Sequence, residues 1–330
     1  MDIIIHTQTP GLRLQILVQK LHAQQQLIQW RIKIIILDYS QIALSNILPF
    51  QNDIKRQSPE EIKNLIRHTT LSTIKSYKKR YSKEYGELVI ACDGPNYWRK
   101  QIFPYYKANR KASREKSELD WGLIFNTLGE LRDELIQSFP YKVINVEGAE
   151  ADDVIAVLAK WSQSNQLIVE GLFDEPQKIL IVSADKDFIQ LQKYKNVRQW
   201  SPMQKKFIQG TQKEVFEYTI THIVKAGDDG IPNILSPDNV FVSGERQKPF
   251  SSKRLPEFFE KGIDACKTDD ERRNYQRNQQ LVNFEFIPES ITNSIISSYE
   301  NGKPKGDKNS IMEYLMKHQC RLLLDDLEDF

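Results

Sequence analysis

Acidic residues recur in five short segments of the 330-residue chain, where they could together hold metal ions. Carboxylates that lie close together raise one another's pKa unless a cation neutralises them. Mg²⁺ meets that need with oxygen ligands and keeps several waters for a phosphate substrate. Two such ions about 4 Å apart can activate a water and stabilise both oxygens of a displacement at phosphorus. We therefore predict a site for two Mg²⁺ ions, which Mn²⁺ could replace, built from Asp38, Asp93, Glu150, Asp152, Asp153, Asp185, Asp187, Asp228 and Asp229.

Short apolar runs must position these acids. Nearly continuous β-branched runs are typical of strands buried on both faces. The predicted strands are 32–38, 87–93, 141–146 and 178–185, and helical patterns at 59–83, 121–138 and 151–163 alternate with them. Asp38, Asp93 and Asp185 each end a predicted strand. One such Asp commonly caps a helix or a turn, but ligands of open α/β sheets bind at this edge. We predict a mostly parallel α/β sheet with flanking helices and the site at its edge.

The cluster Glu150-Ala151-Asp152-Asp153 opens a helix with apolar periodicity. Acids in a first helical turn also complement the helix dipole, which is the structural alternative to a metal site. No other catalytic arrangement competes, because the five His residues are scattered and carry no motif. The three Cys residues lie far apart without a CxxC pair, so neither a disulfide framework nor a thiolate zinc site is indicated. A reducing cytoplasm fits this cysteine usage.

A basic segment with interleaved aromatic residues follows Asp93 directly. Between Tyr97 and Lys116 there are seven Lys or Arg residues, one Glu and five aromatic residues. Backbone phosphates attract the cations, and exposed bases can stack on the rings. Cations beside a metal site can also stabilise charge that develops on a scissile phosphate. The alternative is an amphipathic helix with a solvated face. We predict nucleic-acid contacts from Tyr97, Trp98, Arg99, Tyr105, Tyr106, Lys107 and Arg110.

The chain changes character after about residue 200, where the strand signal fades and helical patterns dominate. These patterns cover 213–225, 253–264, 269–280, 288–299 and 310–324. We predict an extension at residues 1–31 that could be disordered, a core at 32–205 and a helical domain at 206–330. No window approaches 18 uninterrupted apolar residues, so no membrane partner is expected.

These motifs resemble the flap endonuclease family of 5′ nucleases from about Ile34 to the C-terminus. The resemblance is carried by residues 37–45, 97–99, 105–110, 150–153, 183–188 and 199–203. It implies a PIN-like α/β nuclease core, a helical arch at about 95–116 and a helix-hairpin-helix element that binds duplex DNA. It also implies removal of RNA primers and 5′ flaps during replication of the kind that phages carry out.

Individual roles also follow from the resemblance. Asp38, Asp93, Asp152 and Asp185 resemble catalytic first-metal ligands, and Glu150, Asp153 and Asp187 resemble second-metal or outer-shell acids. Arg99, Lys107 and Arg110 match arch residues expected near the phosphate, the first two as catalytic groups. The family usually separates two Asp residues by two others before the hairpin, whereas Asp228 and Asp229 are adjacent here. Either could carry the second-metal role, so the second site is less certain. The amides of Gly230 and Ile231 are expected to bind duplex phosphates.

The expected function is therefore a two-metal 5′ to 3′ nuclease that acts on RNA–DNA hybrids and on flap or nicked duplex DNA. One alternative is a non-catalytic, structure-specific DNA-binding protein. Another is a single-strand ribonuclease of the wider PIN class. The acidic segment Leu322 to Phe330 is either a partner peptide for a sliding clamp or single-strand-binding protein, or a final helix with a frayed end. We expect a monomer in the cytoplasm of a host cell.

Overall fold

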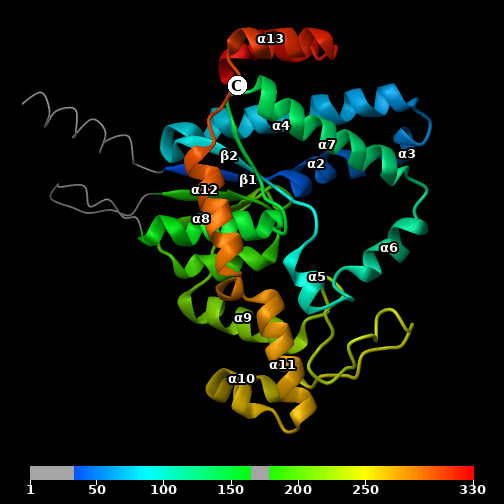
Figure 1. Cartoon of the computed structure of the whole chain (residues 1–330), viewed down its shortest axis with the longest axis vertical. Helices are drawn as coiled ribbons and strands as arrows, with labels where there is room; N and C mark the ends of the chain where they lie inside the picture. Colours follow the sequence, from blue (N-terminus) through cyan, green and yellow to red (C-terminus); the bar gives the residue numbers. More distant parts are fainter. Residues whose placement is uncertain (1–32, 165–177) are drawn as a thin grey trace, which may run out of the picture.

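A mixed six-stranded sheet lies at the centre of the computed structural model, which describes residues 33–164 and 178–330 (Figure 1). The predicted extension at 1–31 lies outside the described residues. The strands are β1 (Ile34–Asp38), β2 (Glu87–Cys92), β3 (Lys142–Asn145), β4 (Ile179–Val182), β5 (Val197–Ser201) and β6 (Lys206–Ile208). Their order is β3-β2-β1-β4-β5-β6. All neighbours are parallel except β5 and β6, which are antiparallel. The predicted mostly parallel sheet is confirmed.

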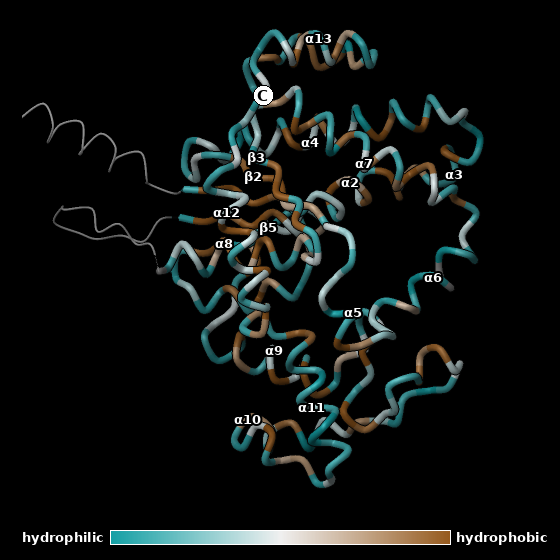
Figure 2. Tube along the Cα trace, viewed as in Figure 1, coloured by the Kyte–Doolittle hydropathy of each residue, from teal (hydrophilic) through white to brown (hydrophobic). Residues whose placement is uncertain are grey.

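Strands β1, β2 and β4 are almost entirely apolar because helices cover both faces of the sheet. Ile35 and Leu37 of β1 belong to one buried cluster and Ile34 and Ile36 to another, as the alternation of side chains along a strand requires. The first cluster packs against α2 (Tyr39–Ile47), α4 (Pro59–Tyr85) and α7 (Trp121–Ser138). The second packs against α8 (Ala151–Ser164) and α12 (Glu289–Asn301). Figure 2 shows the strands as the most hydrophobic part of the trace.

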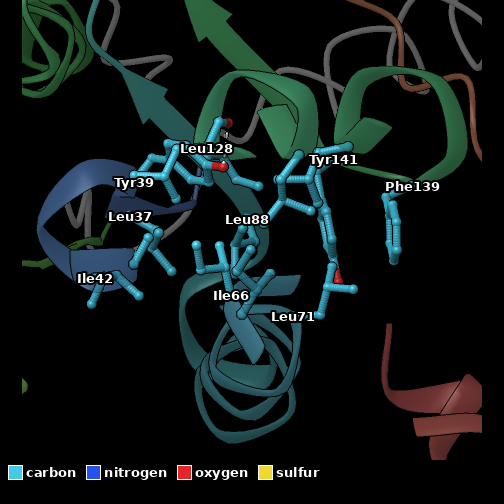
Figure 3. Packing of buried hydrophobic residues seen from close by; sticks show 14 of the residues in the cluster. Leu37, Tyr39, Ile42, Ile66, Leu71, Leu88, Leu128, Phe139 and Tyr141 are labelled. Atoms are coloured by element: carbon cyan, nitrogen blue, oxygen red, sulfur yellow. Dashed lines mark hydrogen bonds between the residues drawn. The ribbon is translucent and has the colours of Figure 1, made fainter. Parts of the chain in front are cut away.

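The first cluster fixes where α2 leaves the sheet. Ile66 and Leu71 of α4 and Leu88 of β2 belong to this cluster, and Figure 3 shows Ile66 below Leu88 and Leu71 near Tyr141. The buried Tyr39 hydroxyl donates a hydrogen bond of 2.8 Å to the Leu128 carbonyl of α7. Tyr39 directly follows the last residue of β1, so this contact anchors the start of α2 beside the sheet edge.

A third cluster lies at the end of the molecule opposite α13 (Figure 1). It is built from α9 (Gln212–Lys225), α10 (Leu255–Lys261) and α11 (Asp269–Val282). The predicted arch region forms two short helices, α5 (Trp98–Ile102) and α6 (Ala108–Glu115). Phe103 and Tyr106, which lie between them, are buried in this third cluster. The base of the arch is therefore part of the same packed unit as the helical region.

The chain returns to the sheet after α11, beyond the core boundary predicted at residue 205. Strand β6 lies past that boundary, α12 packs on one face of the sheet, and α13 (Lys308–Lys317) joins the cluster on the other. The described helices include none that is long and apolar enough to span a membrane. Within residues 206–330, only α9 to α11 form a core of their own.

The acidic C-terminus packs onto the basic helix α4. The helix predicted at 310–324 ends at Lys317, and a 3₁₀ segment (Arg321–Asp329) follows it. The buried Phe330 ring lies 5.5 Å from that of Phe139, and Asp329 pairs with Lys79 at 2.6 Å. The expectation of a frayed end is therefore wrong, because apolar burial and opposite charge both hold this segment in place.

Candidate active site

The acid that ends β1 is fixed by two hydrogen bonds. Asp38 is buried, and its side chain accepts a hydrogen bond of 3.1 Å from the Gln41 amide, which caps α2. Its other oxygen accepts a hydrogen bond of 2.9 Å from the Ser183 hydroxyl, just before Asp185. The ends of β1 and β4 are thus tied together through this carboxylate.

The acid after β2 is tied to two other acidic segments. Asp93 accepts a hydrogen bond of 2.8 Å from the Ser40 hydroxyl, two residues after Asp38. It also accepts one of 3.0 Å from the Ala151 amide, next to Asp152. The sheet edge therefore gathers Asp38, Asp93, Asp152 and Asp185 from four separate chain segments, as predicted.

These carboxylates repel one another. Burial, with the charges of Asp93 and Asp185, raises the pKa of Asp38 to about 7. Burial and then the neighbouring Asp187 raise the pKa of Asp185 to about 6. Burial, followed by the charges of Asp185 and Asp38, holds the pKa of Asp152 well above its usual range. A site with this excess of negative charge favours a cation.

The stability of the metal-free protein should therefore depend on pH through Asp38. The pKa of Asp38 is about 7 in the folded protein and about 3.9 in the unfolded chain. Between these pH values the folded state therefore holds a proton that the unfolded state has lost. Stability is then lost as the pH rises through that window. We expect Asp38→Asn to gain stability relative to the wild type between pH 5 and pH 8. Urea unfolding in EDTA would measure this, and a pH-independent difference would contradict the assignment.

Asp187 belongs to a pair that the sequence did not reveal. Its carboxylate lies 2.9 Å from His222 Nδ1, and the Tyr218 hydroxyl donates a hydrogen bond of 2.9 Å to it. Burial opposes charge here, but the contact with His222 lowers the pKa of Asp187 and raises that of the histidine. We missed His222 because a lone His in α9 carries no motif. Only its position on the face of α9 that meets residues 186–193 could have signalled the contact.

Glu150 and Asp153 are fully buried and paired with Arg99. The Arg99 guanidinium lies 2.7 Å from Glu150 and 2.8 Å from Asp153, and its Nε donates a hydrogen bond of 2.8 Å to the Leu281 carbonyl. The Trp98 indole donates a further hydrogen bond of 3.0 Å to Asp153. Arg99 and Trp98 therefore face inward in this structure and present no group to a nucleic acid. They join the base of the arch to the start of α8.

The charge of Lys107 acts on the acids of the sheet edge, since it opposes the rise in the pKa of both Asp152 and Asp185. Its ammonium contacts Glu150 and lies 3.5 Å from Asp229. Burial opposes its charge, but the charges of Glu150 and Asp229 raise the pKa of Lys107 above its usual value, so it stays a cation. Arg110 pairs with Asp229 and remains half exposed. Lys107 and Arg110 thus both lie beside the hairpin acid Asp229.

The adjacent acids of the hairpin have different surroundings. Asp229 is engaged by Lys107, Arg110 and, at 3.3 Å, the Tyr106 hydroxyl. Asp228 lines a small cavity with Asp152, Asp187 and His222, among others. In the described part of the chain its carboxylate makes no hydrogen bond or ion pair. Asp228 is thus the member of the pair that is free to take a cation in this conformation.

The aromatic residues divide by exposure. Tyr105 is 37% exposed and Tyr97 is partly exposed, whereas Tyr106 is buried and donates a hydrogen bond of 3.0 Å to Glu150. Ile231 is buried in the cluster of the helical region. Gly230 has a φ of +74°, and a Cβ added there would lie 3.1 Å from the Tyr105 carbonyl oxygen, which is a tight contact. The hairpin loop and the arch base are therefore in direct contact.

The donor set fits Mg²⁺ better than a softer ion. Within residues 33–164 and 178–330, no three His, Cys, Asp or Glu side chains group closely enough to hold an ion by themselves. Mg²⁺ commonly takes one or two carboxylates and completes its shell with water and substrate oxygens. The acids at the sheet edge offer only oxygen donors, and burial together with neighbouring carboxylates raises the pKa of Asp38 and Asp185. This arrangement suits hydrated Mg²⁺.

Two family descriptions together cover the chain from residue 33 to its end. The "5′-3′ exonuclease, N-terminal resolvase-like domain" matches residues 33–220, more than half of the chain. The chain belongs to the 5′–3′ exonuclease family. The description "T4 RNase H, C terminal" matches residues 218–330. The family predicted from the motifs is thus confirmed, and the chain is a nuclease of this family.

Relatives of this nuclease include Ribonuclease H of Enterobacteria phage T4, which is 34% identical over 311 residues, or 90% of this chain and 95% of that protein. Flap endonuclease Xni of Shewanella woodyi is 33% identical over 45% of this chain and 54% of its own length. A solved structure of T5 5′-exonuclease with bound zinc has a TM-score of 0.56 at 18% identity, covering 82% of this chain and 99% of that one. At that identity the likeness shows the fold.

Proposed function

We propose that this protein is a divalent-metal-dependent 5′ to 3′ nuclease that removes RNA primers and 5′ flaps from duplex DNA during replication. The observation that carries the proposal is the joining of four Asp residues at one sheet edge beside the cationic base of an arch, with raised pKa values for Asp38, Asp152 and Asp185. Such an edge is the binding position in open α/β sheets.

The acidic residues divide between two metal positions in this proposal. Asp38, Asp93, Asp152 and Asp185 would hold the first ion. Asp187 and Asp228 would face the second, and Glu150, Asp153 and Asp229 would act as outer acids, held by arch cations. When bound, the two ions supply charge stabilisation and lower the pKa of a water. Because Asp229 pairs with the arch residues Lys107 and Arg110, the second metal position needs only Asp228 from this adjacent pair.

The arch residues would then orient the phosphate. Lys107 is a fixed cation, because Glu150 and Asp229 hold its charge. Arg110 is more exposed and can leave Asp229 for a backbone phosphate at small cost, since exposed ion pairs are weak. Tyr97 and Tyr105 have exposed ring surface on which bases could stack. These residues place the scissile bond next to the acids.

The hairpin after α9 would bind the duplex as part of a helix-hairpin-helix element. Ala226, Gly227, Asp229 and Gly230 all have positive φ, which makes a tight turn. The Gly227 amide donates a hydrogen bond of 2.8 Å to the Ile231 carbonyl and closes it. Backbone amides at such turns can meet duplex phosphates without reading sequence. The contact of Gly230 with Tyr105 would then link duplex binding to the arch.

Relatives support nucleic acid and metal as ligands. A structure of T5 D15 flap endonuclease is described as a pseudo-enzyme-product complex with DNA and metal ions, at a TM-score of 0.53 and 17% identity. We propose the same classes of ligand for this chain. A monomer in the host cytoplasm, with sliding clamp and single-strand-binding protein as partners, completes the proposal. A clamp peptide at residues 322–330 would have to leave its packed position on α4.

A panel of substrates tests the function. RNA–DNA hybrid, 5′-flap DNA, nicked duplex and single-stranded RNA would each be incubated with the protein and Mg²⁺. We expect cleavage of the hybrid and the flap and little cleavage of single-stranded RNA. Preferred cleavage of single-stranded RNA would favour the ribonuclease alternative. Tight flap binding that is independent of Mg²⁺, without any product, would favour the non-catalytic alternative.

A further inference from the structure

A buried glutamine lies beneath the loop that carries Asp185. Gln199 is in β5 and is 1% exposed. Its side-chain amide nitrogen donates two hydrogen bonds to the segment that follows β4, to the Ser183 carbonyl at 3.1 Å and to the Asp185 carbonyl at 2.6 Å. One side chain thus binds two carbonyls, on either side of Ala184, just after β4 ends.

The loop held by Gln199 controls two of the strand-end acids. The Ser183 hydroxyl donates to Asp38, and the Asp185 amide donates to the Ser183 hydroxyl oxygen at 3.1 Å. The Asp185 carboxylate in turn caps the 3₁₀ segment (Lys186–Lys193) by accepting from the Asp187 amide. A shift of this loop would therefore move the Asp185 carboxylate and loosen the support of Asp38.

The orientation of the Gln199 amide is fixed by its other contacts. Two carbonyl oxygens face its nitrogen, so only the NH₂ end can lie there. Its oxygen accepts a hydrogen bond of 3.2 Å from the side-chain amide of Gln192, which is also buried. The Gln192 oxygen accepts one of 2.7 Å from the Gly210 amide, just before α9. These contacts form a buried chain of amides that connects the acidic loop to the helical region.

We propose that Gln199 is a positioning residue for the metal site, which acts by fixing the loop that presents Asp185 and supports Asp38. This inference rests on the proposed metal-dependent function. Met in place of Gln199 would keep the apolar stem but leave the buried Ser183 carbonyl and the partly buried Asp185 carbonyl without this donor. The loop would then shift to regain hydrogen bonds. Loss of such an outer partner commonly weakens metal binding by about ten- to a hundredfold.

Gln190 provides a matched control. It is also buried, lies in the Lys186–Lys193 segment, and donates a hydrogen bond of 2.9 Å to the Val282 carbonyl at the end of α11. The variant Gln190→Met therefore loses a buried amide of the same kind that holds no part of the acidic loop. Differences between the two variants report on the loop rather than on general stability.

The test is calorimetric titration of the full-length protein with Mn²⁺, together with the Mg²⁺ concentration for half-maximal cleavage. We expect Gln199→Met to raise the dissociation constant for Mn²⁺ and the Mg²⁺ concentration for half-maximal cleavage by about tenfold or more each. Gln190→Met should match the wild type, and excess Mg²⁺ should restore most of the rate of Gln199→Met. Equal metal affinity in Gln199→Met and Gln190→Met would overturn the inference.

A second variant covers the case in which Gln199→Met does not fold. Gln192→Met removes only the contact to the Gln199 oxygen and to Gly210, so a smaller shift of metal affinity in the same direction is expected. No shift would count against the inference. If the wild type binds Mn²⁺ but cleaves no substrate, the proposed function fails while the positioning role is still decided by the titration. If it binds no divalent ion, both fail.

Discussion

Asp185→Asn is expected to lower the rate of flap cleavage at saturating substrate by about a thousandfold. A bound metal ion stabilises transition-state charge by several kcal/mol, and each ~1.4 kcal/mol changes the rate about tenfold. Asn keeps the shape and can still accept from the Asp187 amide, so the 3₁₀ segment after it should persist. The rate is measured with a 5′-labelled flap in Mg²⁺.

Thermal unfolding separates this loss from damage to the fold. Burial and Asp187 raise the pKa of Asp185, so the charged form destabilises the metal-free protein at neutral pH. Asp185→Asn should therefore unfold at an equal or higher temperature in EDTA. Asp264→Asn, at an exposed acid paired with Arg272, is the control and should cleave normally. A rate for Asp185→Asn within tenfold of the wild type would contradict the assigned role.

Arg99→Met is expected to destabilise the fold by about 3–5 kcal/mol, because it leaves the buried Asp153 without its cation and Glu150 with Lys107 alone. Glu150 and Asp153 are both fully buried, and Arg99 bridges them. Urea unfolding gives the free energy of unfolding. The double variant Arg99→Met with Asp153→Asn should recover much of the loss, since the remaining acid Glu150 keeps its pairing with Lys107.

A surface arginine serves as the control for this change. Arg272 pairs with Asp264 where both side chains are well exposed, so Arg272→Met should change stability by less than about 0.5 kcal/mol. A similarly small effect of Arg99→Met would show that the buried network does not hold the arch base to α8. The contrast between the two arginines isolates the effect of burial.

The fold was predictable where apolar patterns are long. The strands at the centre and helix α7 follow their predicted spans closely, because continuous burial on two faces leaves an unbroken apolar run. Strands β5 and β6 were missed because they are short and carry polar residues. Gln199 interrupts the apolar pattern of β5, and its side-chain amide donates hydrogen bonds to the loop that follows β4.

The acids at the strand ends were also predictable, since parallel strands bring their carboxyl ends to one edge. The partners of the outer acids were not. Arg99 lies in a basic segment that is typical of a nucleic-acid contact. Its guanidinium instead pairs with Asp153 of α8 and with Glu150 just before that helix. His222 meets Asp187 only through the packing of α9. Long-range ion pairs of this kind leave no periodic trace in the sequence.

The most direct test of the central claim is the position of cleavage on an RNA-primed duplex labelled at either end. With Mg²⁺ present, the account predicts short products released from the 5′ end, complete loss of cleavage in EDTA, and recovery when Mg²⁺ or Mn²⁺ is returned. Cleavage that proceeds in EDTA, or that starts from the 3′ end, would contradict a metal-dependent 5′ to 3′ nuclease.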